Sequence, residues 1–288
     1  MLDERLLKQI SSLHYLPRHA VLGQVGGKQL SKRKGLSLDF AEHRNYLAGD
    51  DYRYIDWNLY GRLDRLFVKV FVREEDYPVY LLVDLSQSMR VGNKLPYACR
   101  LAGALGYIAL KDQNRLGVYP FSSKLNVERA WYPRAGWQQT LALFEFLQAL
   151  AVTETTDFNH ALSQFASLNL NRGLVLIFSD MFSEQGYQEG LIALRSARFS
   201  VGVLHLLAES DLDPQLPHEV WLTSAERGPS RRRLSGPESV RAYVRALQQY
   251  IAQLQAFCHH YEIGYLQLPA TLSLERALLE RLRGRVLA

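Results

Sequence analysis

Apolar runs alternate with helix-length stretches along most of this chain. Strand-like apolar runs occur near residues 79–83, 115–121, 174–178, 199–207 and 263–268. Strands that are buried on both faces appear as uninterrupted apolar runs, and their alternation with helices is typical of a parallel sheet. We therefore predict an α/β domain over residues 76–288, with a mostly parallel sheet and helices on both of its faces.

The first part of the chain has a different pattern. Apolar and polar residues alternate over 66–72, which predicts a strand, and Gly26-Gly27 and Gly49-Asp50-Asp51 predict turns. We expect a small strand-bearing N-terminal segment over residues 1–75. A second irregular stretch, near 210–236, is expected to be a polar insertion in the α/β domain.

Composition places the chain among soluble globular proteins. Of its 288 residues 48% are hydrophobic and 22% charged. We find no run of about 20 apolar residues, and the amphipathic start with its acidic residues is unlike a signal peptide. Cys99 and Cys258 are far apart and lack metal-ligand spacing, which favours two buried thiols in a reducing compartment. We expect a cytoplasmic protein without a transmembrane segment.

The net charge of +5 arises partly from basic clusters at 28–35 and 226–236. Such clusters sometimes contact nucleic acid or acidic surfaces. No aromatic-basic alternation or recognisable nucleic-acid module accompanies them. We interpret them as solvated loops and expect no nucleic-acid partner.

Two carboxylates follow apolar strands directly. Asp84 ends the run from Tyr80, and Asp180 follows the run from Leu174. Ligands of open parallel sheets gather beyond the carboxyl ends of the strands. Ser86 and Ser88 share a face with Asp84, because alternate residues of an extended segment point the same way. Carboxylate and hydroxyl oxygens suit magnesium, so the pattern indicates part of a metal site.

Other interpretations of the stretch Asp84-Leu85-Ser86-Gln87-Ser88 stay open. Asp and Ser are good helix caps, and a helix is predicted to begin shortly afterwards. Alternatively, Asp84 would be the nucleophile of a magnesium-dependent phosphohydrolase. Such enzymes usually carry a second acid two residues on, where this chain has Ser86.

This stretch resembles the Asp-x-Ser-x-Ser element of von Willebrand factor A-like domains. Their metal ion-dependent adhesion site (MIDAS) also uses a threonine on a second loop and an aspartate on a third. Thr156 and Asp180 match these positions, with Thr155 as the alternative ligand because Glu154 and Thr155 replace the usual glycine pair. The resemblance implies a Rossmann-like von Willebrand A fold and Mg²⁺, or Mn²⁺ or Ca²⁺ in its place, at Asp84, Ser86, Ser88, Thr156 and Asp180.

The N-terminal part resembles the signature that precedes such a domain in a large bacterial family, domain of unknown function fifty-eight. The matching residues are Arg44, Tyr46, Gly49, Asp50, Asp51, Arg53, Ile55, Asp56 and Trp57. The resemblance implies a non-catalytic accessory protein that works with a MoxR-type AAA+ ATPase in chaperone-like assembly or remodelling of other proteins. A carboxylate of a partner protein would then bind the metal.

Three further expectations concern residues outside the predicted ligand set. For the N-terminal signature two interpretations stay open: internal packing, with Tyr46 and Trp57 buried and Arg53 paired to one of the nearby aspartates, or a direct binding role. His259 and His260 adjoin Cys258, but neighbouring residues of a helix point about 100 degrees apart. These histidines are therefore expected to be ordinary helix positions, and His160 is expected on the helix that follows Thr156.

Overall fold

The computed structural model describes residues 3–16, 39–46, 52–72, 78–153, 156–214, 219–223 and 231–288. The chain forms two compact units: Gly26–Asp76 is one, and Met1–Val25 together with Tyr77–Ala288 is the other. The segment expected over residues 1–75 is therefore divided, because Ile10 and Leu13 lie in the core of the larger unit. Among the residues described, no helix combines the length and apolar character needed to cross a bilayer.

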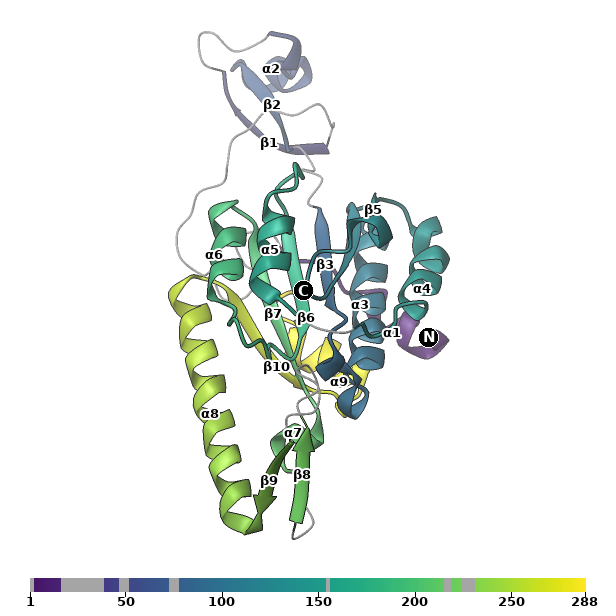
Figure 1. Cartoon of the computed structure of the whole chain (residues 1–288). Coiled ribbons are helices and arrows are strands. Elements are labelled where there is room, and N and C mark those ends of the chain that lie inside the picture. Colours follow the sequence, from purple (N-terminus) through teal and green to yellow (C-terminus); the bar gives the residue numbers. More distant parts are fainter. Residues whose placement is uncertain are drawn as a thin grey trace. The chain divides into compact units, whose positions relative to one another are not determined.

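A six-stranded sheet forms the centre of the larger unit, in the order β10-β7-β6-β3-β4-β5 (Figure 1). All neighbouring strands are parallel except β5, which is antiparallel to β4. The predicted α/β class and mostly parallel sheet are confirmed. The short edge strand β5 was not predicted, since it contains Pro133 and has only four residues. The strands are β3 Val79–Asp84, β4 Leu116–Phe121, β5 Trp131–Arg134, β6 Leu174–Ser179, β7 Ser200–Leu207 and β10 Gly264–Pro269.

Helices cover both faces of this sheet, as predicted (Figure 1). Apolar residues of α1, α3, α4 and the C-terminal segment pack on one face, and those of α5, α6 and α8 pack on the other. The helices are α1 Glu4–Ile10, α3 Lys94–Lys111, α4 Thr140–Gln148, α5 Phe158–Ala166, α6 Gln188–Ser196, α7 Glu209–Leu212, α8 Gly236–His260 and α9 Leu274–Arg276. Short 3₁₀ segments lie at η3 Gln87–Asn93, η4 Val127–Arg129 and η5 Trp137–Gln139, and a π-helix, η6, spans Ala277–Leu282.

Strand β3 shows why the apolar runs are uninterrupted. Val79, Leu81 and Val83 belong to the core on one face, whereas Tyr80 and Leu82 belong to the core on the other. Every residue of the strand is buried, so neither face accepts a polar residue until the strand ends. Asp84 is the last residue of β3 and is the first polar one.

An aromatic cluster anchors α5 to the sheet. The ring of Phe165 lies 5.0 Å from that of Tyr119 and 5.5 Å from those of Tyr80 and Phe199, measured between centroids. The Phe165–Tyr119 and Phe165–Tyr80 pairs are edge-on, a favourable arrangement for aromatic side chains. The cluster fixes the helix whose N-terminus follows Thr156.

The insertion expected near 210–236 contains a β-ribbon. Strand β8, Glu219–Thr223, pairs antiparallel with β9, Arg231–Ser235. The arginines at 231–233 therefore lie in a strand, and their assignment to a loop was wrong. The other basic cluster, at 28–35, lies outside the described residues.

Helix α8 follows this ribbon and confirms the predicted helical spacing. Leu247, Leu254 and Cys258 are buried along one side of it. His259 and His260 are exposed in its last turn, as expected for ordinary helix positions. Cys99 and Cys258 are both buried free thiols, which was also predicted.

In the smaller unit, β1 Asp39–Asn45 pairs antiparallel with β2 Phe67–Val72. Helix α2, Trp57–Leu63, begins after Asp56, whose carboxylate accepts hydrogen bonds from the amides of Asn58 and Leu59. The predicted burial of Trp57 was wrong: its side chain is 62% exposed, at the first position of α2. Tyr46 is half-buried, and residues 49–51 of the signature lie outside the described residues.

Candidate functional site

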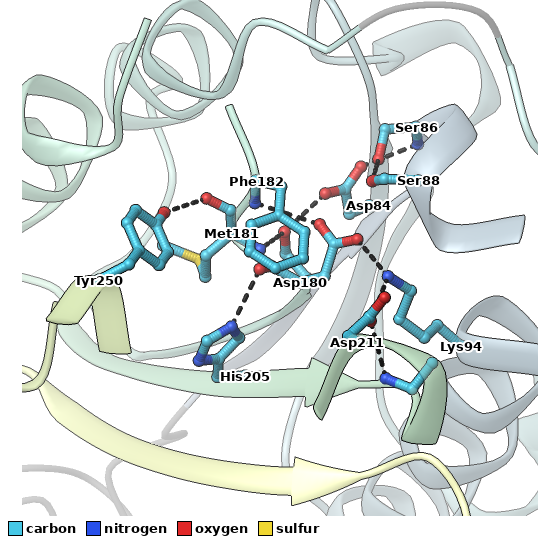
Figure 2. Close-up of polar contacts among 12 residues, drawn as sticks. Asp84, Ser86, Ser88, Lys94, Asp180, Met181, Phe182, His205, Asp211 and Tyr250 are labelled. Atoms are coloured by element: carbon cyan, nitrogen blue, oxygen red, sulfur yellow. Dashed lines mark hydrogen bonds and ion pairs between the residues drawn. The ribbon is translucent and has the colours of Figure 1, made fainter. Parts of the chain in front are cut away.

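The carboxyl ends of β3 and β6 bring two predicted acids to one edge of the sheet. These strands are hydrogen-bonded neighbours, β3 ends at Asp84, and Asp180 directly follows β6. Both side chains are buried, with 2% and 0% exposure. Figure 2 shows them near Ser86 and Ser88 of the first loop.

The carboxylate of Asp84 is held by two hydrogen bonds from neutral groups. Its Oδ1 accepts from the amide of Ser86 at 2.8 Å, and its Oδ2 accepts from the hydroxyl of Ser179 at 2.6 Å. Burial, and then repulsion from Asp180, raise the pKa of Asp84 to about 6. Asp84 is thus largely ionised at neutral pH, and no cationic side chain among the described residues pairs with it.

The two serines of the first loop bring their hydroxyls together. Ser86 Oγ and Ser88 Oγ are 3.0 Å apart. Ser86 lies just before η3 but makes no side-chain capping bond to it. The capping interpretation therefore does not explain these hydroxyls, whose oxygens lie beside the ionised Asp84.

The loop before α5, which carries Thr156 and is the second loop of the site, is held by backbone hydrogen bonds to residues that directly follow β3 and β4. The Thr153 amide donates to the carbonyl of Leu85 at 2.7 Å, and the Asp157 amide donates to the carbonyl of Ser122 at 3.1 Å. Thr156 is buried, and its hydroxyl donates to the same Ser122 carbonyl over a long 3.5 Å. Within the part of the chain that is described, Thr156 makes no hydrogen bond to Asp84, Ser86 or Ser88. Thr155, the alternative ligand, lies outside the described residues.

The fifth predicted ligand, Asp180, is paired with a lysine. Lys94 Nζ donates to Asp180 Oδ2 at 2.6 Å and to Asp211 Oδ2 at 3.0 Å, and the Phe182 amide donates to Asp180 Oδ1 at 3.2 Å. Burial lowers the pKa of Lys94, but the attraction of Asp180 and Asp211 outweighs it, and the pKa lies above its ordinary value. Lys94 is therefore a buried ammonium ion.

Sequence reasoning did not identify Lys94 or Asp211. One signal for Lys94 was present, since Pro96 predicts the start of a helix around a lysine. The helix dipole disfavours a cation in the first turn, so a lysine at this position indicates that an acidic residue lies nearby in the fold. Asp211 carried no comparable signal: it lies in α7, and its Oδ2 also accepts from the amide of Ala208.

A neutral histidine, His205, supports the loop after β6, which carries Asp180 and is the third loop of the site. His205 Nε2 lies 2.9 Å from the carbonyl of Asp180, and its Nδ1 lies 2.6 Å from the hydroxyl of Tyr265. Burial lowers the pKa of His205 to about 4, so the ring is neutral near pH 7. Because a carbonyl only accepts, Nε2 carries the proton and Nδ1 accepts from Tyr265.

Met181 adopts a backbone conformation that its neighbours hold in place. Its φ is +60°, in the left-handed region that non-glycine residues seldom adopt. The Met181 amide donates to the hydroxyl of Ser179 at 2.8 Å, and its carbonyl accepts from Tyr250 of α8. Ser179 thus bonds both Asp84 and Met181, which links the loops that follow β3 and β6.

Gly92 offers a stability test of the first loop. Its φ is +59°, and a Cβ there would lie 2.2 Å from the Cβ of Ala208. We expect Gly92→Ala to lower the free energy of unfolding by about 2–4 kcal/mol through backbone strain and overlap, measured by urea denaturation. Adding Ala208→Gly should recover part of this loss, and no recovery would contradict the contact. Gly61→Ala is the control, since nothing lies within 4 Å of its Cβ position.

Comparison with known proteins identifies distant relatives. An uncharacterized protein of Mycobacterium tuberculosis and one of Mycobacterium bovis are each 23% identical over 233 residues, which cover 78% of this chain and 73% of the relative. Among solved structures, the conserved hypothetical protein BatB from Bacteroides thetaiotaomicron is similar at 15% identity and a TM-score of 0.44, over 70% of this chain and 95% of that one. A von Willebrand factor type A protein from Catenulispora acidiphila matches at 13% identity and a TM-score of 0.38, over 49% of this chain and 35% of that one.

A protein-family model also matches most of the chain. Residues 42–247 match the family described as "Protein of unknown function DUF58". The matched range includes the smaller unit's α2 and β2 and all five predicted metal ligands. Because the match spans more than half of the chain, this protein belongs to the DUF58 family.

Proposed function

We propose that this protein is a divalent-cation-dependent protein-binding module without catalytic activity of its own. The observation that carries this proposal is the buried carboxyl group of Asp84, which has no cationic partner among the described residues and lies beside two serine hydroxyls. A buried carboxylate without a counter-ion is costly, and a cation would offset that cost. Oxygen donors of these two kinds fit Mg²⁺.

Asp84, Ser86 and Ser88 would hold the ion, with Thr156 completing the set from the second loop. Asp180 would act from outside this set through water, since its carboxylate is already paired with the Lys94 ammonium ion. When bound, Mg²⁺ would supply a positive centre with a coordination position for an anionic ligand. The serines contribute neutral oxygens, so the single carboxylate of Asp84 leaves a net positive charge on the centre.

The partner would present an aspartate or glutamate carboxylate to this centre. The resemblance to the family implies a MoxR-type AAA+ ATPase and its protein substrates as partners, in assembly or remodelling of other proteins. The alternative, a phosphohydrolase with Asp84 as nucleophile, is less well supported. Such enzymes usually carry a second acid two residues after the nucleophile, where this chain has Ser86.

Manganese binding tests the site. Mn²⁺ prefers the same oxygen ligands as Mg²⁺ and is detected through water-proton relaxation. We expect one saturable Mn²⁺ site that Mg²⁺ displaces, that Asp84→Ala abolishes and that Asp157→Asn, a nearby change at a helix cap, leaves intact. A wild-type protein that binds neither ion would refute the proposal.

The same variants test the partner. Cation and partner are linked ligands, so each should raise the affinity for the other. We expect purified MoxR-type ATPase to bind the wild-type protein in Mg²⁺ and to lose at least about tenfold in affinity in EDTA or with Asp84→Ala. Equal affinity in all of these conditions would show that the ion plays no part in binding the ATPase.

A further inference from the structure

Lys94 is the least expected residue near the proposed ion site. Its side chain is 1% exposed, and its ammonium lies between the carboxylates of Asp180 and Asp211, 5.5 Å from the centroid of the Phe182 ring. Figure 2 shows the Lys94 side chain directed toward the carboxylates of Asp180 and Asp211. An ammonium in such a place is retained only because two carboxylates offset its loss of hydration.

Helix α3 gives no local reason for a lysine at this position. Lys94 is the first residue of α3, at the positive end of the helix dipole, and the first turn contains no acidic residue. The nearby acids come from two other segments, the loop after β6 and helix α7. The lysine is therefore matched to the acids across the sheet edge and not to its own helix.

The three acidic residues of the site differ in whether a cation neutralises them. The carboxylates of Asp180 and Asp211 share the Lys94 ammonium, whereas no cationic side chain among the described residues pairs with Asp84. Asp84 is the carboxylate left for a divalent ion. An ion held by one carboxylate and neutral oxygens keeps a net positive charge, which favours an anion at its remaining position.

Resting on the proposed function, we propose that Lys94 determines what the ion site selects. By acting as the counter-ion of Asp180, it weakens cation binding and makes the bound centre selective for a carboxylate ligand. The competing explanation is that Asp180 binds the ion directly and Lys94 only stabilises the fold. The two explanations differ in the effect of removing both charges together.

A charge cycle measured by Mn²⁺ relaxation separates them. If only charge matters, Lys94→Met should bind Mn²⁺ at least about tenfold more tightly than wild type, and Asp180→Asn at least about tenfold more weakly. The double variant Lys94→Met/Asp180→Asn restores the wild-type charge and should bind within about threefold of wild type. If Asp180 is a direct ligand, the double variant will bind as weakly as Asp180→Asn, which would overturn the inference.

Controls separate folding from charge. Lys111→Met removes a lysine from the same helix, about 25 Å from Lys94, and should leave Mn²⁺ affinity unchanged. Lys94→Arg keeps the charge and should not tighten binding. Lys94→Met leaves the carboxylates of Asp180 and Asp211 without a cation and could misfold for that reason. The double variant leaves only Asp211 in this state, so it gives a result even if Lys94→Met does not fold.

Acetate tests selectivity for the anion. Acetate that binds Mn²⁺ displaces water, so it should lower the relaxation enhancement of the Mn²⁺-loaded protein at constant ionic strength. We expect Lys94→Met to require at least about fivefold more acetate than wild type for the same decrease. Equal sensitivity would overturn the inference while Mn²⁺ binding and its loss in Asp84→Ala still supported the proposed function. Absence of Mn²⁺ binding in wild type would defeat the proposed function itself.

Discussion

Replacing Asp84 with asparagine should stabilise the metal-free protein and abolish its stabilisation by magnesium. In EDTA at pH 8, wild type contains a buried, ionised Asp84 close to Asp180, whereas the variant carries a neutral amide of the same shape. We expect the variant to unfold at a higher urea concentration, with a free energy of unfolding greater by on the order of 2 kcal/mol.

This difference should depend on pH with a defined sign. Because folding raises the pKa of Asp84 to about 6, the folded state retains its proton over a pH range in which the unfolded state has lost it. The stability of wild type relative to Asp84→Asn should therefore fall between about pH 4 and pH 6–7 and level off above that range. A relative stability that rises over this interval would show that Asp84 is not desolvated as described.

Magnesium should reverse the order of the two proteins. An ion that binds only the folded state contributes about 2.7 kcal/mol at one hundred times its dissociation constant. Wild type should gain this amount at saturating Mg²⁺, whereas Asp84→Asn should gain nothing. Equal gains in both proteins would place the ion elsewhere, and no gain in either would contradict the proposed function.

Truncating Phe165 should strongly destabilise the larger unit. Its side chain is fully buried and contacts the rings of Tyr80, Tyr119 and Phe199. We expect Phe165→Ala to lower the free energy of unfolding by about 3–5 kcal/mol, because it leaves a cavity between α5 and the sheet. Urea denaturation in EDTA measures this without a contribution from metal.

An exposed aromatic residue provides the matched control for Phe165. Trp137 is 63% exposed at the start of the α4 region, and Trp137→Ala should change stability by less than about 0.5 kcal/mol. A Phe165→Ala loss as small as that of the control would mean that the helix is not packed on the sheet as described.

The sheet was predictable because its strands are buried on both faces. Runs such as 79–83 and 174–178 contain no polar residue, and their ends fix where Asp84 and Asp180 emerge. Strand β5 and the ribbon of β8 and β9 were missed because neither carries such a run. In β9 three consecutive arginines gave the pattern of a solvated loop, although the backbone pairs with β8.

The first loop and the two acids were also predictable, since each follows a strand directly. The partners of those acids were not. Lys94, 86 positions before Asp180, binds both Asp180 and Asp211, which lies 31 positions after Asp180, and only the folded sheet edge brings the three together. Trp57 was expected to be buried because large aromatic residues usually are, but the first position of α2 leaves its ring exposed.

The backbone hydrogen bonds of Leu85 affect how much entropy is lost when an ion binds. Its amide donates to the carbonyl of Phe121, and its carbonyl accepts from the Thr153 amide, so one residue joins the strand-end loops before any ligand arrives. Most of the conformational entropy that such loops lose has already been lost during folding. Cation binding would then need little rearrangement of the main chain, and its free energy would remain available for holding the partner.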